Sequence, residues 1–167
     1  MPQFNWLILL LSALIPLIVG FLWYNPKTFL SIWMESIGKT QDSMQAPNMV
    51  KVYLITFIMG FLAAISIQFI VIHQWHYYSI LANEVGINDA TSPIGLKMKE
   101  FMDQYGHNFR TFKHGAFHGT LTGIFLITPI ITINALFEGR GFKYIAVNAG
   151  YWIVTIALMG GLICAYT

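Results

Sequence analysis

Residues 113–140 read KHGAFHGTLTGIFLITPIITINALFEGR. Most of this stretch is apolar, and about 20 such residues are needed for one helix to cross a bilayer. His114 and His118 are four residues apart, so they share one face near the start of the predicted helix. The stretch therefore predicts a membrane-spanning helix with two imidazoles at one end.

Glycines repeat at the same four-residue spacing beside these histidines. Such a strip carries no side chains, which lets another helix approach it backbone to backbone in lipid. Shorter strips of small residues occur in other apolar segments. The glycines predicted to pack helices are Gly115, Gly119, Gly123, Gly60 and Gly161.

The composition of the whole chain indicates that a bilayer is its solvent. Of its 167 residues, 56% are hydrophobic and only 10% are charged, whereas soluble domains carry about a quarter charged residues. The net charge is +2 without a basic run, which disfavours a nucleic-acid partner. The single cysteine, Cys164, excludes an intrachain disulfide.

Four apolar segments are long enough to span the membrane. We therefore expect an all-α fold, a four-transmembrane-helix bundle forming a single integral membrane domain over residues 1–167. Pro16 is expected to kink the first helix, because proline removes a backbone donor. The predicted spans are residues 4–23, 50–72, 112–137 and 142–165.

Two short amphipathic helices are predicted on the membrane surface. Asn25-Pro26 is a helix-start signal, and the apolar residues of 27–37 fall largely on one side. Ser92-Pro93 starts the second, whose apolar residues recur at helical spacing as far as Phe109. Residues 39–47 are polar and are predicted to form a loop.

Four histidines are predicted to gather at one membrane face. His73 and His76 follow the second span, and His114 and His118 open the third. Imidazoles at this spacing are suitable ligands for zinc, copper, iron or haem. A metal or haem site is one reading of the cluster; proton handling and structural hydrogen bonding are the alternatives.

A second polar group lies at the opposite end of the third span. Asn134 and Glu138 are one helical turn apart, and Arg140 follows in the turn before the fourth span. Ionisable groups at the edge of a span can be functional. A solvated ion pair between Glu138 and Arg140 is the favoured interpretation.

Several motifs along nearly the whole chain resemble one family. It comprises small bacterial four-helix inner-membrane proteins known only as a domain of unknown function. The resemblance implies a multi-pass protein of the bacterial inner (cytoplasmic) membrane, and it implies no activity. The motifs are Trp23-Tyr24-Asn25-Pro26-Lys27, His114-Gly115, His118-Gly119, residues 134–140, Phe142-Lys143-Tyr144, Asn148, Gly150-Tyr151-Trp152 and Met159-Gly160.

The small-residue strips and the scarcity of intramembrane charge favour an oligomeric or assembly subunit without enzyme activity. Its partners would be the lipid bilayer and further copies of the chain or other membrane subunits. One alternative is a metal- or haem-binding membrane enzyme using the histidines. The other is a small channel or transporter, whose pore would be lined by Gln68, Thr120, Thr128, Thr132, Asn134 and Asn148.

Overall fold

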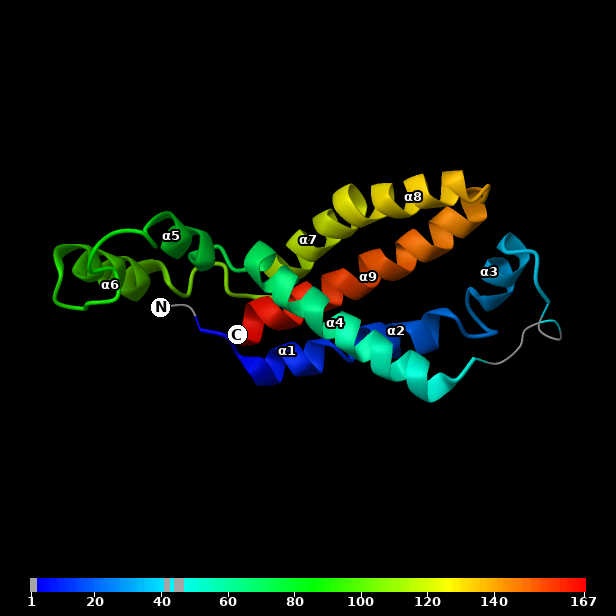
Figure 1. Ribbon diagram of the computed structural model, residues 1–167, viewed down its shortest axis with the longest axis horizontal. Coiled ribbons are helices and arrows are strands. Elements are labelled where there is room, and N and C mark those ends of the chain that lie inside the picture. The colour runs from blue at the N-terminus through cyan, green and yellow to red at the C-terminus, as the bar shows by residue number, and fades with distance from the viewer. Residues whose placement is uncertain (1–2, 41–42, 44–46) are drawn as a thin grey trace.

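Four apolar helical spans cross the molecule in the computed structural model, which describes residues 3–40, 43 and 47–167 (Figure 1). No strand occurs among these residues. The all-α, four-span prediction is therefore confirmed, with bounds close to the expected ones. The spans are Trp6–Trp23, Met49–Val71 (α4), Phe112–Phe137 and Phe142–Tyr166 (α9).

The first span is broken where the sequence predicts a kink. It consists of α1 (Trp6–Ser12) and α2 (Ile15–Trp23), with Pro16 in the first turn of α2. Proline cannot donate a backbone hydrogen bond, and its ring crowds the preceding turn. The chain therefore leaves regular helix just before Pro16 and resumes with the proline at a tolerated position.

The third span contains a wider turn that the sequence did not reveal. It runs through α7 (Phe112–Thr122), a π-helical turn, η2 (Gly123–Ile127), and α8 (Thr128–Phe137). The Thr128 N–H bonds to the Gly123 carbonyl, and the Thr128 hydroxyl also donates to it at 2.8 Å. The wider turn comes directly before Pro129, where a regular helix would meet the proline ring.

Both predicted surface helices are present, as α3 (Leu30–Ser36) and α6 (Pro93–Tyr105). The Ser92 side chain caps α6 by accepting from the Gly95 N–H at 2.9 Å. A further helix, α5 (Gln74–Ile80), was not predicted. In the predicted loop at 39–47, residues 41, 42 and 44–46 lie outside the described part of the chain.

Because the chain has four spans, the remaining elements lie at the two ends of the bundle. Figure 1 places α5 and α6 beyond the bundle, at the end where α1 begins and α9 finishes, and α3 at the opposite end. The segment between α4 and α7, the start of α1 and the end of α9 therefore lie at one membrane face. This arrangement brings residues that are far apart in sequence to the same face.

The fourth span, α9, is the centre of the bundle. It contacts α1, α2, α3, α4 and every part of the third span, and Figure 1 shows it between the others. In its apolar window 56% of residues are buried, against 11–28% in the other spans. Those spans expose large apolar side chains such as Phe21 and Phe125. Lipid is a suitable solvent for such a surface.

The glycine strip of the third span faces α9 of the same chain. A Cβ built on Gly115 would lie 2.1 Å from the Gly160 carbonyl oxygen, and one on Gly119 would lie 2.4 Å from that of Ile156. A Cβ on Gly123 would lie 2.8 Å from the Ile153 Cα. Only glycine allows this approach of the two backbones.

The other two glycines predicted to pack helices also face neighbours within the chain. A Cβ on Gly60 of α4 would lie 2.9 Å from the Ala13 carbonyl oxygen, at the break in the first span. A Cβ on Gly161 would lie 2.6 Å from the Phe112 ring. All five glycines are thus covered inside one chain, so contacts between copies would need other surfaces.

Candidate metal centre

Two local features bring histidines from different spans together. At the end of α4, Ile72 adopts an extended conformation, and His73 then begins a new direction as the N-cap of α5. The Thr111 side chain caps α7 by accepting from the His114 N–H at 3.2 Å. This cap fixes the start of α7, so that His114 and His118 occupy successive turns at the same membrane face.

Three imidazoles meet at this point. The Nε2 atoms of His73 and His114 lie 2.9 Å apart, and one nitrogen from each of His73, His114 and His118 lies within 4.8 Å of the other two. The ring centroids are 4.5–5.0 Å apart. Without an ion, the shortest contact is a hydrogen bond in which one ring donates and the other accepts.

The spacing of these nitrogens is close to that of a metal site. A tetrahedral ion with metal–nitrogen bonds of about 2.0–2.1 Å holds its ligand nitrogens about 3.3 Å apart. The 2.9 Å separation of the His73 and His114 nitrogens is slightly shorter than this value, and all three nitrogens lie within 4.8 Å of one another. No fourth His, Cys, Asp or Glu of the described residues joins the group, which leaves a coordination position open.

The surroundings favour the neutral imidazole that metals require. Burial lowers the pKa of His73, and the neighbouring rings of His118 and His76 lower it further. A neutral ring keeps a lone pair for a metal. The His73 side chain is exposed and the other two are half-buried, so the group is accessible from the membrane surface.

The two remaining histidines lie outside this group. The rings of His76 and His73 are 6.4 Å apart, and His76 does not join the three nitrogens although the sequence suggests it as a fourth ligand. The turn into α5 separates these two residues, which a continuous α4 would have kept on one face. His107 lines a different pocket, near the end of α9.

The sequence matches the family described as "Protein of unknown function (DUF1761)" over residues 7–164. The chain belongs to the DUF1761 family. This match confirms the resemblance to a domain of unknown function, and it covers the three histidines and nearly all of the four spans. No curated protein and no solved structure matches the chain.

Beside the three histidines, this DUF1761 protein has an apolar cavity of about 330 Å³. Its wall includes His73 itself and the rings of Tyr77 and Phe101, which stack at 3.7 Å. Phe109 adopts a left-handed backbone conformation, with φ of 61°, and its ring lies 5.1 Å from that of His114. Such strain in a non-glycine residue is concentrated at functional sites. The sequence showed Phe109 only as the last apolar residue of a surface helix.

The second predicted polar group forms the expected ion pair at the opposite membrane face. Arg140 Nε lies 3.8 Å from a Glu138 carboxylate oxygen, and both side chains are substantially exposed. Asn134 and Glu138 line a small pocket with Asn148, whose side chain accepts from the Tyr24 hydroxyl at 2.9 Å. These contacts are consistent with a structural role at the membrane edge.

The side chains suggested for a pore are mostly engaged within their own helices. The hydroxyls of Thr120, Thr128 and Thr132 donate to carbonyls of the preceding turn of the third span. Gln68 is fully buried, and its amide atoms have no partner among the described residues. These contacts do not specifically support the alternative that the protein is a channel or transporter.

Proposed function

We propose that this DUF1761 protein binds a divalent transition-metal ion at one membrane face through His73, His114 and His118. The observation that carries the proposal is the approach of one nitrogen from each ring to within 4.8 Å of the others. Imidazole is a good ligand for zinc, copper, nickel and cobalt, and affinity among them follows the general order of divalent metals. His73 closely follows α4, and His114 and His118 lie in α7. Ion binding would therefore also fix these two helices relative to each other.

The ligand number favours a metal that acts on another molecule. Structural zinc sites are usually closed by four protein ligands, whereas catalytic sites have three ligands and a bound water or substrate. The apolar cavity that includes His73, Tyr77, Phe101 and Phe109 in its wall suits an apolar molecule beside the site. The metal would supply a Lewis acid or an activated water there.

Haem receives less support than a single metal ion. Two imidazoles that bind one haem iron lie on opposite sides of the macrocycle, about 4 Å apart. The His73 and His114 nitrogens are 2.9 Å apart, which leaves no room for a flat ring between them. A haem would therefore require the ends of α4 and α7 to separate.

The proposal is tested by metal analysis of the purified protein. The protein in detergent is treated with a chelator, exposed to excess Zn²⁺, desalted and analysed by mass spectrometry for zinc per chain. We expect about one zinc ion per chain. The His107→Ala variant is the matched control, because it removes a histidine at the same membrane face but outside the group, and it should bind the same amount. Zinc far below one equivalent in both proteins would overturn the proposal.

The role as an oligomeric or assembly subunit in a bacterial inner membrane stays a prediction. The glycine strips that motivated it are covered within the chain, so a partner would bind to the apolar outer faces of the other spans. Native mass spectrometry of the protein released from detergent would give the number of copies. A single mass corresponding to one chain, under conditions that preserve the fold, would count against a stable homo-oligomer.

A further inference from the structure

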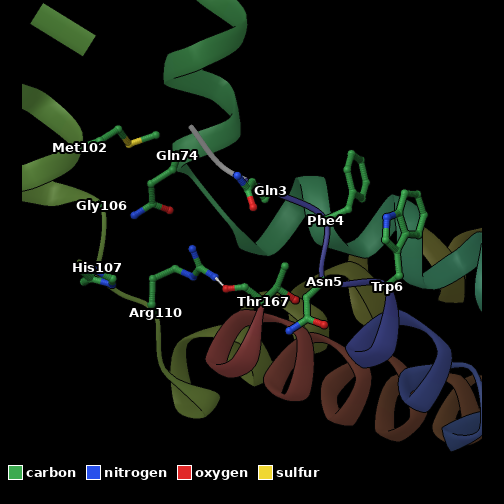
Figure 2. Close-up of a pocket in the computed structure, with 10 residues that line it drawn as sticks. All are labelled: Gln3, Phe4, Asn5, Trp6, Gln74, Met102, Gly106, His107, Arg110 and Thr167. Atoms are coloured by element: carbon green, nitrogen blue, oxygen red, sulfur yellow. Dashed lines mark hydrogen bonds between the residues drawn. The ribbon is translucent and has the colours of Figure 1, made fainter. Parts of the chain in front are cut away.

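A second pocket lies at the same membrane face, at the end of α9. It has a volume of about 540 Å³ and lies among the start of α1, the start of α5 and the segment after α6 (Figure 2). None of the three clustered histidines lines it, so it is separate from the candidate metal centre. Its lining residues are Gln3, Phe4, Asn5, Trp6, Gln74, Met102, Gly106, His107, Arg110 and Thr167.

Arg110 provides the cationic side of the pocket. Its Nε donates to the Cys164 carbonyl at 3.0 Å, and Nη2 donates to a main-chain oxygen of Thr167, the last residue of the sequence. Its other N–H groups have no acceptor among the described residues, and no Asp or Glu side chain lines the pocket. Burial lowers the pKa of the guanidinium. A phosphate in the pocket would accept from the N–H groups that these two main-chain oxygens leave free.

Gln74 provides a hydrogen-bond acceptor without a donor, on the side of the pocket opposite Arg110. Its side chain is 7% exposed, and its Nε2 donates to the carbonyls of Tyr105 and Asn108 at 3.3 and 3.0 Å. The Oε1 atom is buried and has no partner among the described residues. Figure 2 shows the Gln74 carboxamide and the Arg110 guanidinium pointing toward each other across the pocket. A buried acceptor without a partner is costly and indicates a missing donor.

The location of the pocket indicates where a ligand would come from. Trp6 lines it at the start of the first span, and tryptophan is enriched at the level of lipid headgroups. Arg110 comes two residues before the third span, and α9 ends in the same region. The polar groups of the pocket therefore lie where phospholipid phosphates are found.

We propose that this pocket binds a phosphate group that carries a nearby hydrogen-bond donor, as in the headgroup of a phospholipid. The phosphate oxygens would accept from the free N–H groups of Arg110. An ammonium or hydroxyl group attached to the phosphate would donate to Gln74 Oε1. Phosphatidylethanolamine and phosphatidylglycerol have such a donor, whereas the quaternary ammonium of phosphatidylcholine has none.

Phosphatidylethanolamine and phosphatidylcholine make a matched pair, because both headgroups have the same net charge and differ in the donor. Native mass spectrometry of the protein, titrated with each lipid in detergent, gives the bound fraction. We expect about tenfold tighter binding of phosphatidylethanolamine, from one hydrogen bond to a charged group. Soluble phosphoethanolamine is added in a separate arm. Displacement of the lipid at comparable concentration would assign the site to a soluble phosphate ester with the same chemistry.

Variants connect the lipid preference to this pocket. Gln74→Leu should abolish the tenfold preference, because it removes the acceptor for the headgroup donor. Arg110→Gln should weaken binding of both lipids, and Arg110→Lys should retain part of the affinity because the charge is kept. Lys97→Gln, an exposed cation of α6 outside the pocket, should bind as the unmodified protein does. Protection of buried Cys164 from a thiol reagent checks that each variant is folded. Equal binding of both lipids by the unmodified protein, an unchanged preference in folded Gln74→Leu, or unchanged binding of both lipids in folded Arg110→Gln would overturn the proposal.

Discussion

Replacing Gly119 with alanine should destabilise the bundle by about 2 kcal/mol, although alanine is normally the better helix former. The new Cβ would lie 2.4 Å from the Ile156 carbonyl oxygen and 2.8 Å from the Ala157 Cα. These are backbone atoms of α9, so the clash is relieved only by moving α7 away from it. Leucine at this position should prevent stable packing of the two helices, because its larger side chain would require a wider separation.

The reactivity of the Cys164 thiol tests this prediction. The thiol is buried where α7 meets α9, and its single S–H lies within hydrogen-bond reach of the carbonyls of Val71 and Phe109. Separation of the helices should make this single cysteine react faster with a maleimide and should lower the unfolding temperature in detergent. Gly20→Ala is the matched control, since its Cβ would make only an ordinary 3.7 Å contact with Tyr151. Similar labelling and unfolding of both variants would contradict the packing of α7 on α9.

Replacing His118 with alanine should weaken zinc binding by about 100-fold or more. Outer-shell partners of a metal ligand already contribute about 10–100-fold to affinity, and a direct ligand contributes at least as much. The His73→Ala and His114→Ala variants should show similar losses, because each ring supplies one of the three nitrogens. Competition of the purified variants with a zinc-sensitive dye measures the three dissociation constants.

The His76→Ala variant distinguishes this three-histidine site from the four-histidine site suggested by the sequence. His76 follows His73 by three residues, but its nitrogens do not join the group. We expect its zinc affinity to stay within a few-fold of the unmodified protein. A loss of zinc affinity comparable to that of His118→Ala would show that His76 is a ligand. It would also show that the start of α5 is placed differently in the metal-bound protein.

Much of the fold could be predicted from the sequence because hydropathy identifies segments whose solvent is lipid. The spans at 50–72 and 142–165 agree with α4 and α9 to within one residue at each end. Hydropathy does not show which face of a span meets which neighbour. The glycine strip on α7 therefore predicted close packing, but not that α9 of the same chain fills it. The wide turn before Pro129 was also hidden, because a proline alone does not specify how a helix accommodates it.

The candidate site was predictable only as a set of residues at one membrane face. Topology places the end of α4 and the start of α7 together, which selects His73, His76, His114 and His118. The choice of three among these depends on the extended conformation of Ile72, which turns α5 away from the axis of α4. Phe109 and Gln74 were missed for a related reason. Their roles depend on a strained turn and on an unpaired buried oxygen, and neither has a sequence signature.

X-ray absorption spectroscopy at the zinc edge, on the zinc-loaded and desalted protein, tests whether His73, His114 and His118 of this DUF1761 protein hold one metal ion. We expect about three imidazole nitrogens at about 2.0–2.1 Å, with one further light ligand. A spectrum fitted by water oxygens alone, or by fewer than two imidazoles, would contradict it.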